Sequence, residues 1–196
     1  EKYADCVGIY DSIDVVITSH THGQFDGSGR AWWDKMIVGD LPPDNKDSRP
    51  KLLKIDHCAD VLVERLTLVN SPSWNLVVNS VRAEIGFVTI KTDRRASQMI
   101  KARLFGDIKS RIEEWMLDEV VKMLPQKMLQ PEDLNTDGID PSGTDFWIHD
   151  CDISNDDDSI AVKPSGRDTV GIDGTLYNCS QNMLIENTKL VGFGAS

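Results

Sequence analysis

The chain has 196 residues, a formal net charge of −11 and 40% hydrophobic residues, and its mean hydropathy is −0.31. This length suits one domain or part of a longer protein, and no apolar run approaches the roughly 18 residues of a membrane-spanning helix. Because 32 acidic residues outweigh 21 basic ones, electrostatics disfavours nucleic acid, and we expect a globular protein that binds neither nucleic acid nor membranes.

The residue types predict a chain rich in turns. Asp outnumbers Glu by 24 to 8, and Asp favours turns and helix caps whereas Glu favours helix interiors. We therefore expect a mostly β protein. The four cysteines lack the C-x-x-C spacing of zinc or redox sites, and a disulfide between Cys151 and Cys179 is one alternative for two of them. No initiator Met or leader precedes Glu1, so we expect an N-terminus that is processed or absent from this sequence.

Two histidines near the N-terminus, His20 and His22, have the chemistry of metal ligands. They directly precede the stretch GQFDG at residues 23–27, whose glycines and aspartate favour a turn. We therefore interpret both histidines as turn or surface residues, and we expect no metal site and no cofactor.

Four segments share one pattern, a short β-branched run followed by a polar pair and an apolar residue. They end at Leu68, Ile90, Ile153 and Leu190. The first two ends are 22 residues apart, and the next interval of 63 residues leaves 22 again once a 41-residue stretch of different character is set aside. A unit of about 22 residues with short strands is typical of a solenoid. The pattern predicts about six or seven turns, with a longer loop around residues 164–178.

The stretch of different character, residues 93–134, has apolar residues at the three- and four-residue spacing of a helix. It ends at two prolines, Pro125 and Pro131. We expect a helical insertion that packs on the outside of the solenoid. A lid or partner-docking helix is one alternative, and mispredicted sequence is another.

Two acidic groups stand out near the C-terminus, NTDG at residues 135–138 and NDDDS at residues 155–159. Their 20-residue spacing is close to one solenoid turn, so Asp137 should lie beside Asp157 and Asp158 on adjacent strands. Carboxylates at that distance repel one another, and one of them should keep a proton. A neutral acid beside an ionised base suits hydrolysis of a glycosidic bond. The alternatives are a solvated acidic turn and a calcium site, although the calcium-loop pattern with its central Gly is absent.

Six blocks of the sequence occur in a characteristic order, namely GQFDGSGRAWWD, RPKLL, LTLVNSPSWNLVV, NTDGID, NDDDSIAVK and GFGAS. Together they resemble the motifs of one enzyme family, the polygalacturonases and related pectin-cleaving enzymes of glycoside hydrolase family 28. The resemblance implies a right-handed, single-stranded parallel β-helix of the pectin lyase-like kind, with residues 1–196 as a partial β-helix domain and 93–134 as a helical insertion within it. It also implies a secreted, extracellular enzyme that acts on pectic polysaccharide and takes part in cell wall organisation. The full-length enzyme would be a monomer.

The resemblance also implies roles for single residues in the hydrolysis, with inversion, of α-1,4 galacturonosyl linkages in pectin. Asp157 would be the general acid, and Asp137 and Asp158 would together activate the water. The candidate substrate-binding residues are Lys163, Phe193 and Asn135. Lys163 is proposed because it is the base nearest to the Asp pair, and it is alternatively a solvated loop residue, whereas Asn135 alternatively satisfies turn backbone.

One departure from the family pattern affects the expected function. Phe193 stands where the family commonly has the His of Gly-His-Gly, and a phenyl ring can neither titrate nor donate a hydrogen bond. Two alternative functions therefore remain open. One is a catalytically silent β-helix that binds cell-wall polysaccharide, and the other is a related hydrolase that acts on rhamnogalacturonan.

Overall fold

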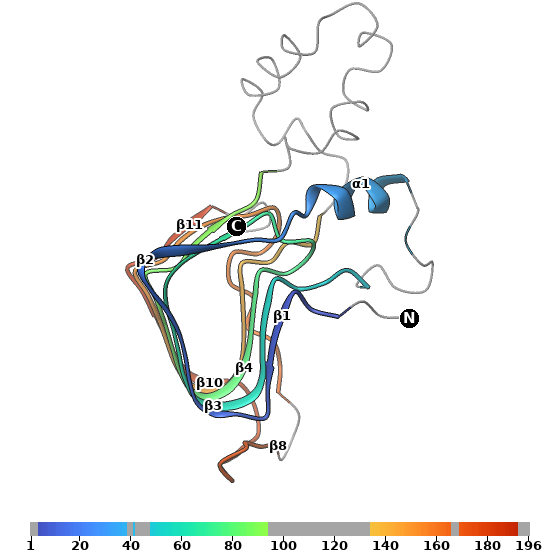
Figure 1. Ribbon diagram of the computed structural model, residues 1–196. Coiled ribbons are helices and arrows are strands. Elements are labelled where there is room, and N and C mark those ends of the chain that lie inside the picture. Colours follow the sequence, from blue (N-terminus) through green and yellow to red (C-terminus); the bar gives the residue numbers. More distant parts are fainter. Residues whose placement is uncertain (1–3, 39–40, 42–47, 94–133, 166–168, 192–196) are drawn as a thin grey trace, which may run out of the picture.

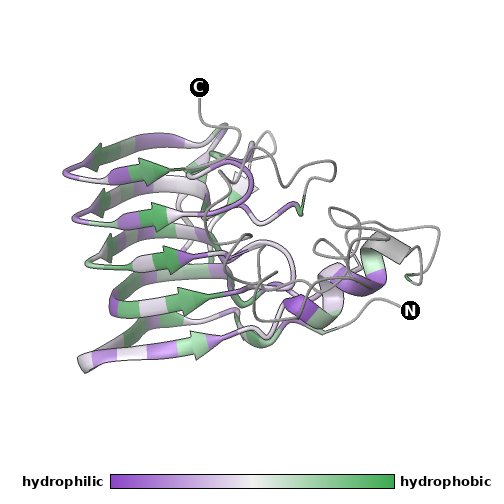
Figure 2. Cartoon of the chain, turned by 90° about the horizontal axis from the view of Figure 1, so that it is seen from above, coloured by the Kyte–Doolittle hydropathy of each residue, from purple (hydrophilic) through white to green (hydrophobic). Residues whose placement is uncertain are grey.

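The structure, a computed structural model, describes residues 4–38, 41, 48–93, 134–165 and 169–191. Parallel strands dominate it and stack on one another as a parallel β-helix (Figures 1 and 2). This confirms the expected all-β fold class. The elements in chain order are β1 (Val7–Tyr10), β2 (Ile13–Asp26), α1 (Arg30–Val38), β3 (Leu53–Val69), β4 (Leu76–Gly86), β5 (Thr89–Lys91), β6 (Ile139–His149), β7 (Asp152–Ser154), β8 (Thr169–Val170), β9 (Leu176–Tyr177), β10 (Gln181–Glu186) and β11 (Lys189–Val191).

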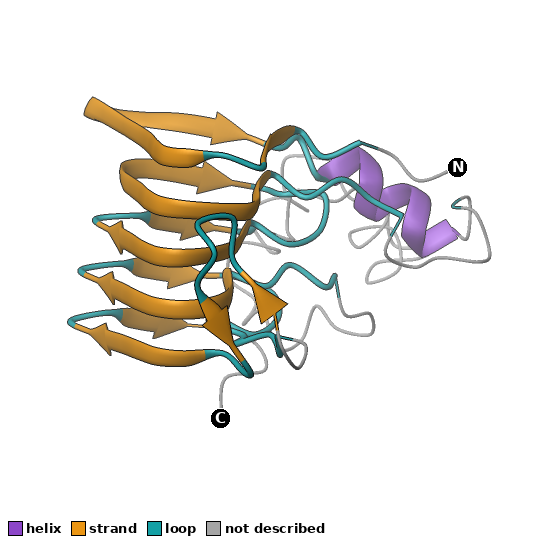
Figure 3. Cartoon of the chain, turned by 90° about the horizontal axis from the view of Figure 1, so that it is seen from below, coloured by secondary structure: helices purple, strands orange, loops and turns teal. Residues whose placement is uncertain are grey.

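Viewed along the stack, each turn of the chain bends twice and traces three sides (Figure 1). The described strands make five such turns, namely β1 with β2, then β3, β4 with β5, β6 with β7, and β10 with β11. The described strands make fewer turns than the predicted six or seven, because the connections between them are longer than a 22-residue repeat allows. One of them carries α1, a helix that the sequence pattern did not indicate, and it leads outward from the stack (Figure 3).

The register of the stack confirms the predicted repeat. Leu68 pairs with Ile90, Ile90 with Ile153, and Ile153 with Leu190. Leu68, Ile90 and Ile153 are fully buried, each with 0% of its surface exposed. Alternate side chains of a strand point to opposite faces, and these three point into the solenoid. Phe25 pairs with Leu68 and extends the same row into the first turn. The solenoid core therefore consists of rows of identical register, one residue from each turn.

The bends between the three sides are made by residues with a left-handed backbone. At one bend Arg65, Phe87, Asp150 and Asn187 have φ values of 54°, 53°, 51° and 49°. Beside the other bend, Asp60, Arg82, Asp145 and Asn182 have φ values between 53° and 63°. Asp and Asn tolerate this conformation better than other non-glycine residues. The bends therefore account for part of the excess of Asp in the sequence.

Three further expectations have different outcomes. Residues 94–133 of the expected helical insertion lie outside the described residues. Cys151 and Cys179 are both free, because Cys151 is buried with its thiol near the His149 carbonyl while Cys179 is exposed. The expected loop around residues 164–178 contains the short antiparallel pair β8 and β9, which projects from the outside of the stack (Figure 3). Among the described elements, no helix is long and apolar enough to span a membrane.

Candidate active site

The two acidic groups lie side by side on adjacent turns of the solenoid. The amide of Gly138 donates a hydrogen bond to the carbonyl of Asp158 at 2.8 Å, and Ile139 donates to Ser159 at 3.0 Å. Ile139 and Ile160 form a parallel bridge one step further along. This register sets Asp137 opposite Asp158, which is the neighbourhood that the 20-residue spacing predicts.

Two buried asparagines hold this part of the backbone. The side-chain amide of Asn155 donates to the backbone carbonyls of Asp157 and Asp158 at 3.0 and 2.7 Å. It also donates to the backbone carbonyl of Thr136 on the neighbouring turn at 3.0 Å. The side-chain amide of Asn75 donates to the backbone carbonyls of Thr136 and Asp137 at 3.1 and 3.0 Å. Buried carbonyls need such donors. Asn75 and Asn155 therefore fix the backbone that presents the carboxylates.

The aspartates of the two groups differ in exposure. Asp137 and Asp156 are buried, with 4% and 3% of their surface exposed, whereas Asp158 is exposed and Asp157 is half-buried. The Asp158 amide donates to Asp157 Oδ1 at 2.8 Å, which ties the Asp157 carboxylate to the turn. Asp157 and Asp158 thus differ in their contact with solvent although they are neighbours in sequence.

Lys163 lies between two buried carboxylates. Its Nζ is 2.8 Å from Asp137 Oδ2 and 3.0 Å from Asp140 Oδ1, and it lies 4.4 Å from the centroid of the Trp74 ring. Lys51 Nζ is 4.6 Å from the centroid of the same ring, so the indole contacts two ammonium groups. Lys163 therefore joins the carboxylate cluster rather than standing alone in solvent.

Asn135 contacts the same tryptophan, because Trp74 Nε1 donates a hydrogen bond to Asn135 Oδ1 at 3.0 Å. Trp74 thus lies among Lys51, Lys163 and Asn135. Phe193, the remaining candidate, lies outside the described residues.

Sequence reasoning missed Asp140, whose side chain is fully buried at 0% exposure. Burial raises the pKa of Asp140 to about 8, the negative charge of Asp137 adds to this rise, and Lys163 opposes it. Burial also acts to lower the pKa of Lys163, but its hydrogen bonds to Asp137 and Asp140 outweigh this effect and the pKa is raised. Burial therefore favours the protonated form of the Asp140 carboxyl over a wider pH range than for an exposed aspartate. The available signal was its place in NTDGID, three residues after Asp137, at the start of an apolar strand.

One oxygen of Asp137 has no N–H or hydroxyl donor among the described residues. Lys163 binds Oδ2, whereas no such donor lies within hydrogen-bond distance of the buried Oδ1, and the side chain of Asp140 is a further hydrogen-bonding neighbour of the Asp137 carboxylate. A buried carboxylate oxygen without a donor is uncommon, because its desolvation is then uncompensated. This oxygen is available to accept a proton or a hydrogen bond from a small molecule. Within the described ranges, no group of three His, Cys, Asp or Glu side chains is placed to hold a metal ion.

The burial of Asp140 predicts a pH-dependent stability. Its pKa in the folded chain lies above its ordinary value of 3.8, so the folded state binds the extra proton and the free energy of unfolding falls as pH rises from about 4 to 8. Asp140→Asn in the full-length protein should remove this slope, which is at most about 1.4 kcal/mol per pH unit. Thermal unfolding measured between pH 5 and 9 checks the difference between the two proteins.

The comparison with Asp140→Asn isolates this effect from other groups. The pKa of His57 is raised by its hydrogen bond to Asp11. The contribution of His57 to the free energy of unfolding therefore also falls as pH rises through about 7, but it falls equally in both proteins. The pKa of Asp60 is lowered by its hydrogen bond to Arg82, and its effect lies below pH 4. Asp152→Asn, at an exposed carboxylate of β7, should leave the slope unchanged. Parallel profiles for the original chain and Asp140→Asn would contradict the assignment.

The described fold is a parallel β-helix with a cluster of buried and exposed carboxylates on one side, where two turns meet. The sequence pattern of the glycosyl hydrolases family 28 matches residues 2–182. The chain belongs to that family, and its resemblance to it is confirmed.

Several named proteins are similar to the chain. It is 34% identical over 173 residues to a probable polygalacturonase of Vitis vinifera, a match covering 87% of the chain and 26% of that protein. It is 31% identical over 144 residues to a polygalacturonase of Chamaecyparis obtusa, covering 71% of the chain and 21% of that protein. It is 27% identical over 159 residues to exopolygalacturonase A of Aspergillus niger, covering 80% of the chain and 28% of that protein.

The chain therefore spans about a quarter of the length of these curated relatives. No solved structure matches it.

Proposed function

We propose that the protein of which this chain is part hydrolyses α-1,4 galacturonosyl linkages in pectin. Its family membership and the polygalacturonase names of its relatives support this substrate. The single observation that carries the proposal is the buried Asp137 carboxylate, which Lys163 holds through Oδ2 and which lies opposite Asp158 on the adjacent turn. A carboxylate fixed in this way is suited to take a proton from a water molecule.

In the proposed reaction two groups of aspartates divide the work. Asp137 and Asp158 remove a proton from a water that attacks the anomeric carbon, and Asp157 gives its proton to the glycosidic oxygen as the bond to that carbon breaks. Attack from the side opposite the leaving group inverts the anomeric centre. Because the water must fit between them, the carboxyl groups of the acid and the base in an inverting enzyme lie roughly 6.5 to 9.5 Å apart. The product is a new reducing end.

Lys163 was expected to bind a substrate carboxylate. Its contacts with Asp137 and Asp140 support a different first role, in which the ammonium compensates the charge of the base and fixes its orientation. Asn135 remains a proposed substrate contact beside Trp74, whose Nε1 donates to the Asn135 Oδ1. For Phe193 the substrate-binding role stays a prediction. Because the proposed substrate is a cell-wall polysaccharide, we also propose an extracellular, monomeric enzyme.

The test is release of reducing ends by the full-length protein from polygalacturonate and, separately, from rhamnogalacturonan. We expect release from polygalacturonate, with the products initially in the inverted anomeric form by NMR. Release from rhamnogalacturonan alone would shift the proposal to the related hydrolase that Phe193 leaves open. A folded protein that binds polygalacturonate but releases nothing from either polymer would instead support a catalytically silent β-helix.

A further inference from the structure

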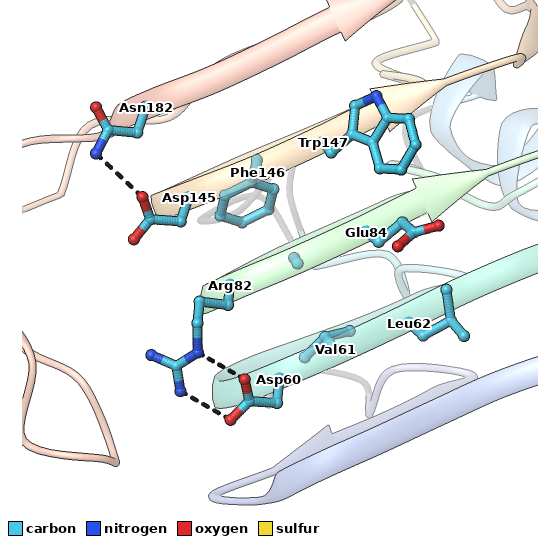
Figure 4. Close-up of a pocket in the computed structure, with 10 residues that line it drawn as sticks. Asp60, Val61, Leu62, Arg82, Glu84, Asp145, Phe146, Trp147 and Asn182 are labelled. Atoms are coloured by element: carbon cyan, nitrogen blue, oxygen red, sulfur yellow. Dashed lines mark hydrogen bonds and ion pairs between the residues drawn. The ribbon is translucent and has the colours of Figure 1, made fainter.

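A second concave site lies on a different side of the solenoid from Asp137. It is a groove of about 450 Å³ on the outer face of β3, β4, β6 and β10 (Figure 4), a volume within the range of small-ligand sites. We call it the Trp147 groove. Its lining includes the row Asp60, Arg82, Asp145 and Asn182 beside the bend, together with Glu84 and Trp147.

Trp147 is an exposed aromatic ring that its neighbours hold in one orientation. With 41% of its surface exposed, its indole stacks on the His149 ring with centroids 3.9 Å apart, and its Nε1 donates to Glu186 Oε1 at 3.0 Å. His149 is itself buried at 4% exposure and lies 2.8 Å from Asp150 and 3.3 Å from Glu84. A ring fixed in this way loses little conformational freedom when a ligand packs against it.

His149 fits against the neighbouring strand because residue 86 is a glycine. Gly86 is opposite His149 in the register, and a Cβ at Gly86 would lie 2.6 Å from the imidazole ring. His149 can therefore support the Trp147 ring only because Gly86 of β4 has no side chain.

Across the groove from Trp147, the polar row is bound together by its own contacts (Figure 4). Arg82 donates to both Asp60 oxygens, at 2.6 and 2.7 Å, and also to Asp173 at 2.8 Å. Asn182 donates to Asp145 at 3.0 Å. The carboxylates keep lone pairs for further donors. This rim is therefore ordered in advance and offers mainly acceptors.

The charge of the groove selects among ligands. Asp60, Glu84 and Asp145 carry three negative charges, and the one guanidinium among the lining residues is already paired with two carboxylates. An anionic chain would be repelled. A ligand with many hydroxyl donors, no charge and an apolar face fits an acceptor-rich rim beside a fixed indole. A neutral sugar ring has these three properties.

We propose that the Trp147 groove binds a neutral oligosaccharide, with one sugar ring packed on the Trp147 indole and its hydroxyls donating to Asp145 and its neighbours on the rim. The site is separate from the Asp137 cluster and shares no residue with it. The proposal goes beyond the proposed hydrolysis and does not depend on it. In a polymer with both charged and neutral segments, the groove would hold a neutral segment.

The experiment is calorimetric titration of the full-length protein with β-1,4-linked galactotetraose, an uncharged probe, and with tetragalacturonic acid. We expect binding of galactotetraose that weakens at least tenfold in Trp147→Ala and several-fold in Asp145→Asn, which keeps a residue that tolerates the left-handed backbone. Asp137→Asn should bind galactotetraose as the original protein does, although hydrolysis of polygalacturonate should fail in that variant.

The two proposals can fail separately. Trp147→Ala should still release reducing ends from polygalacturonate, which also shows that the variant folds, and Asp145→Asn provides the test if Trp147→Ala does not. No binding of galactotetraose by the original protein, or unchanged binding in a folded Trp147 or Asp145 variant, overturns the groove proposal. Tighter binding of tetragalacturonic acid than of galactotetraose by Asp137→Asn, lost on adding Trp147→Ala, overturns the choice of a neutral ligand.

Discussion

Replacing Asp137 by Asn in the full-length protein should lower kcat on polygalacturonate by about 10² to 10⁴, the usual contribution of a general acid or base. The reason is local: Asn keeps the shape and can still accept a hydrogen bond from Lys163, now 2.8 Å from Oδ2, but an amide oxygen cannot take a proton from water near neutral pH. Asp157→Asn and Asp158→Asn should have losses of the same order. Initial rates of reducing-end release measure all three.

Stability should separate these variants from misfolded ones. Asp157→Asn keeps an oxygen that can accept from the Asp158 amide and removes the possibility of a further negative charge in a repelling cluster, so its melting temperature should stay equal or rise slightly. Asp137→Asn loses an ion pair with Lys163 and should not gain stability.

Two controls define the site further. Asp152→Asn, at an exposed carboxylate outside the cluster, should retain full turnover. Asp156→Asn, at a buried carboxylate that the motif leaves outside the proposed trio, should lose much less activity than its neighbours. Equal losses for Asp156 and Asp157, or retained turnover in Asp157→Asn, would mean that the acid has been assigned to the wrong residue.

Gly143→Ala should destabilise the protein more than a typical surface substitution, lowering the free energy of unfolding by about 2–5 kcal/mol. Gly143 has a φ of +124°, which an alanine rarely adopts. A Cβ there would also lie 1.9 Å from the carbonyl oxygen of Ser80 on the neighbouring turn. That carbonyl belongs to the β4 backbone and cannot move without disturbing the β4–β6 pairing. Thermal unfolding should show the loss as a drop of roughly 5–15 °C.

Gly174→Ala is the matched control for Gly143→Ala. Gly174 also has a positive φ, of +84°, but apart from its chain neighbours no heavy atom of the described residues lies within 4 Å of the position of its Cβ. Its substitution should therefore cost only the left-handed strain, about 1–2 kcal/mol. Similar losses at the two glycines would contradict the argument that close packing between turns decides the effect. Gly143 also donates to Ser180 Oγ, which donates to the Lys163 carbonyl, so its displacement should reach the carboxylate cluster.

The stacking register was predictable from the sequence because a solenoid repeats one local problem. Each turn must bury an apolar residue at the same place, so Leu68, Ile90 and Ile153 recur at matching positions and pair in the structure. The adjacency of the acidic groups followed from the same repeat, since one turn of spacing means neighbouring strands. The number of turns was not predictable, because loop lengths outside the repeat obey no packing constraint from the core.

Other features depend on contacts that the repeat does not encode. Arg82 and Phe87 adopt a left-handed backbone although neither favours it, because the neighbouring turns at the same bends, with Asp60 and Asp150, impose the same path. Trp147 reads as one more large residue in a strand, and only its position over His149 and beside Glu186 makes it a fixed surface.

The sequence by itself determined the family, the repeating core and the neighbourhood of Asp137 and Asp158, because motifs and period are local properties of the chain. Only the tertiary structure decided the electrostatics of the cluster. Asp140 and Lys163 lie 23 residues apart in the sequence and meet because adjacent turns superpose them, with burial raising the pKa of Asp140 to about 8. Burial and charge pairing are sums over neighbours from different turns, so no single segment of the chain contains them.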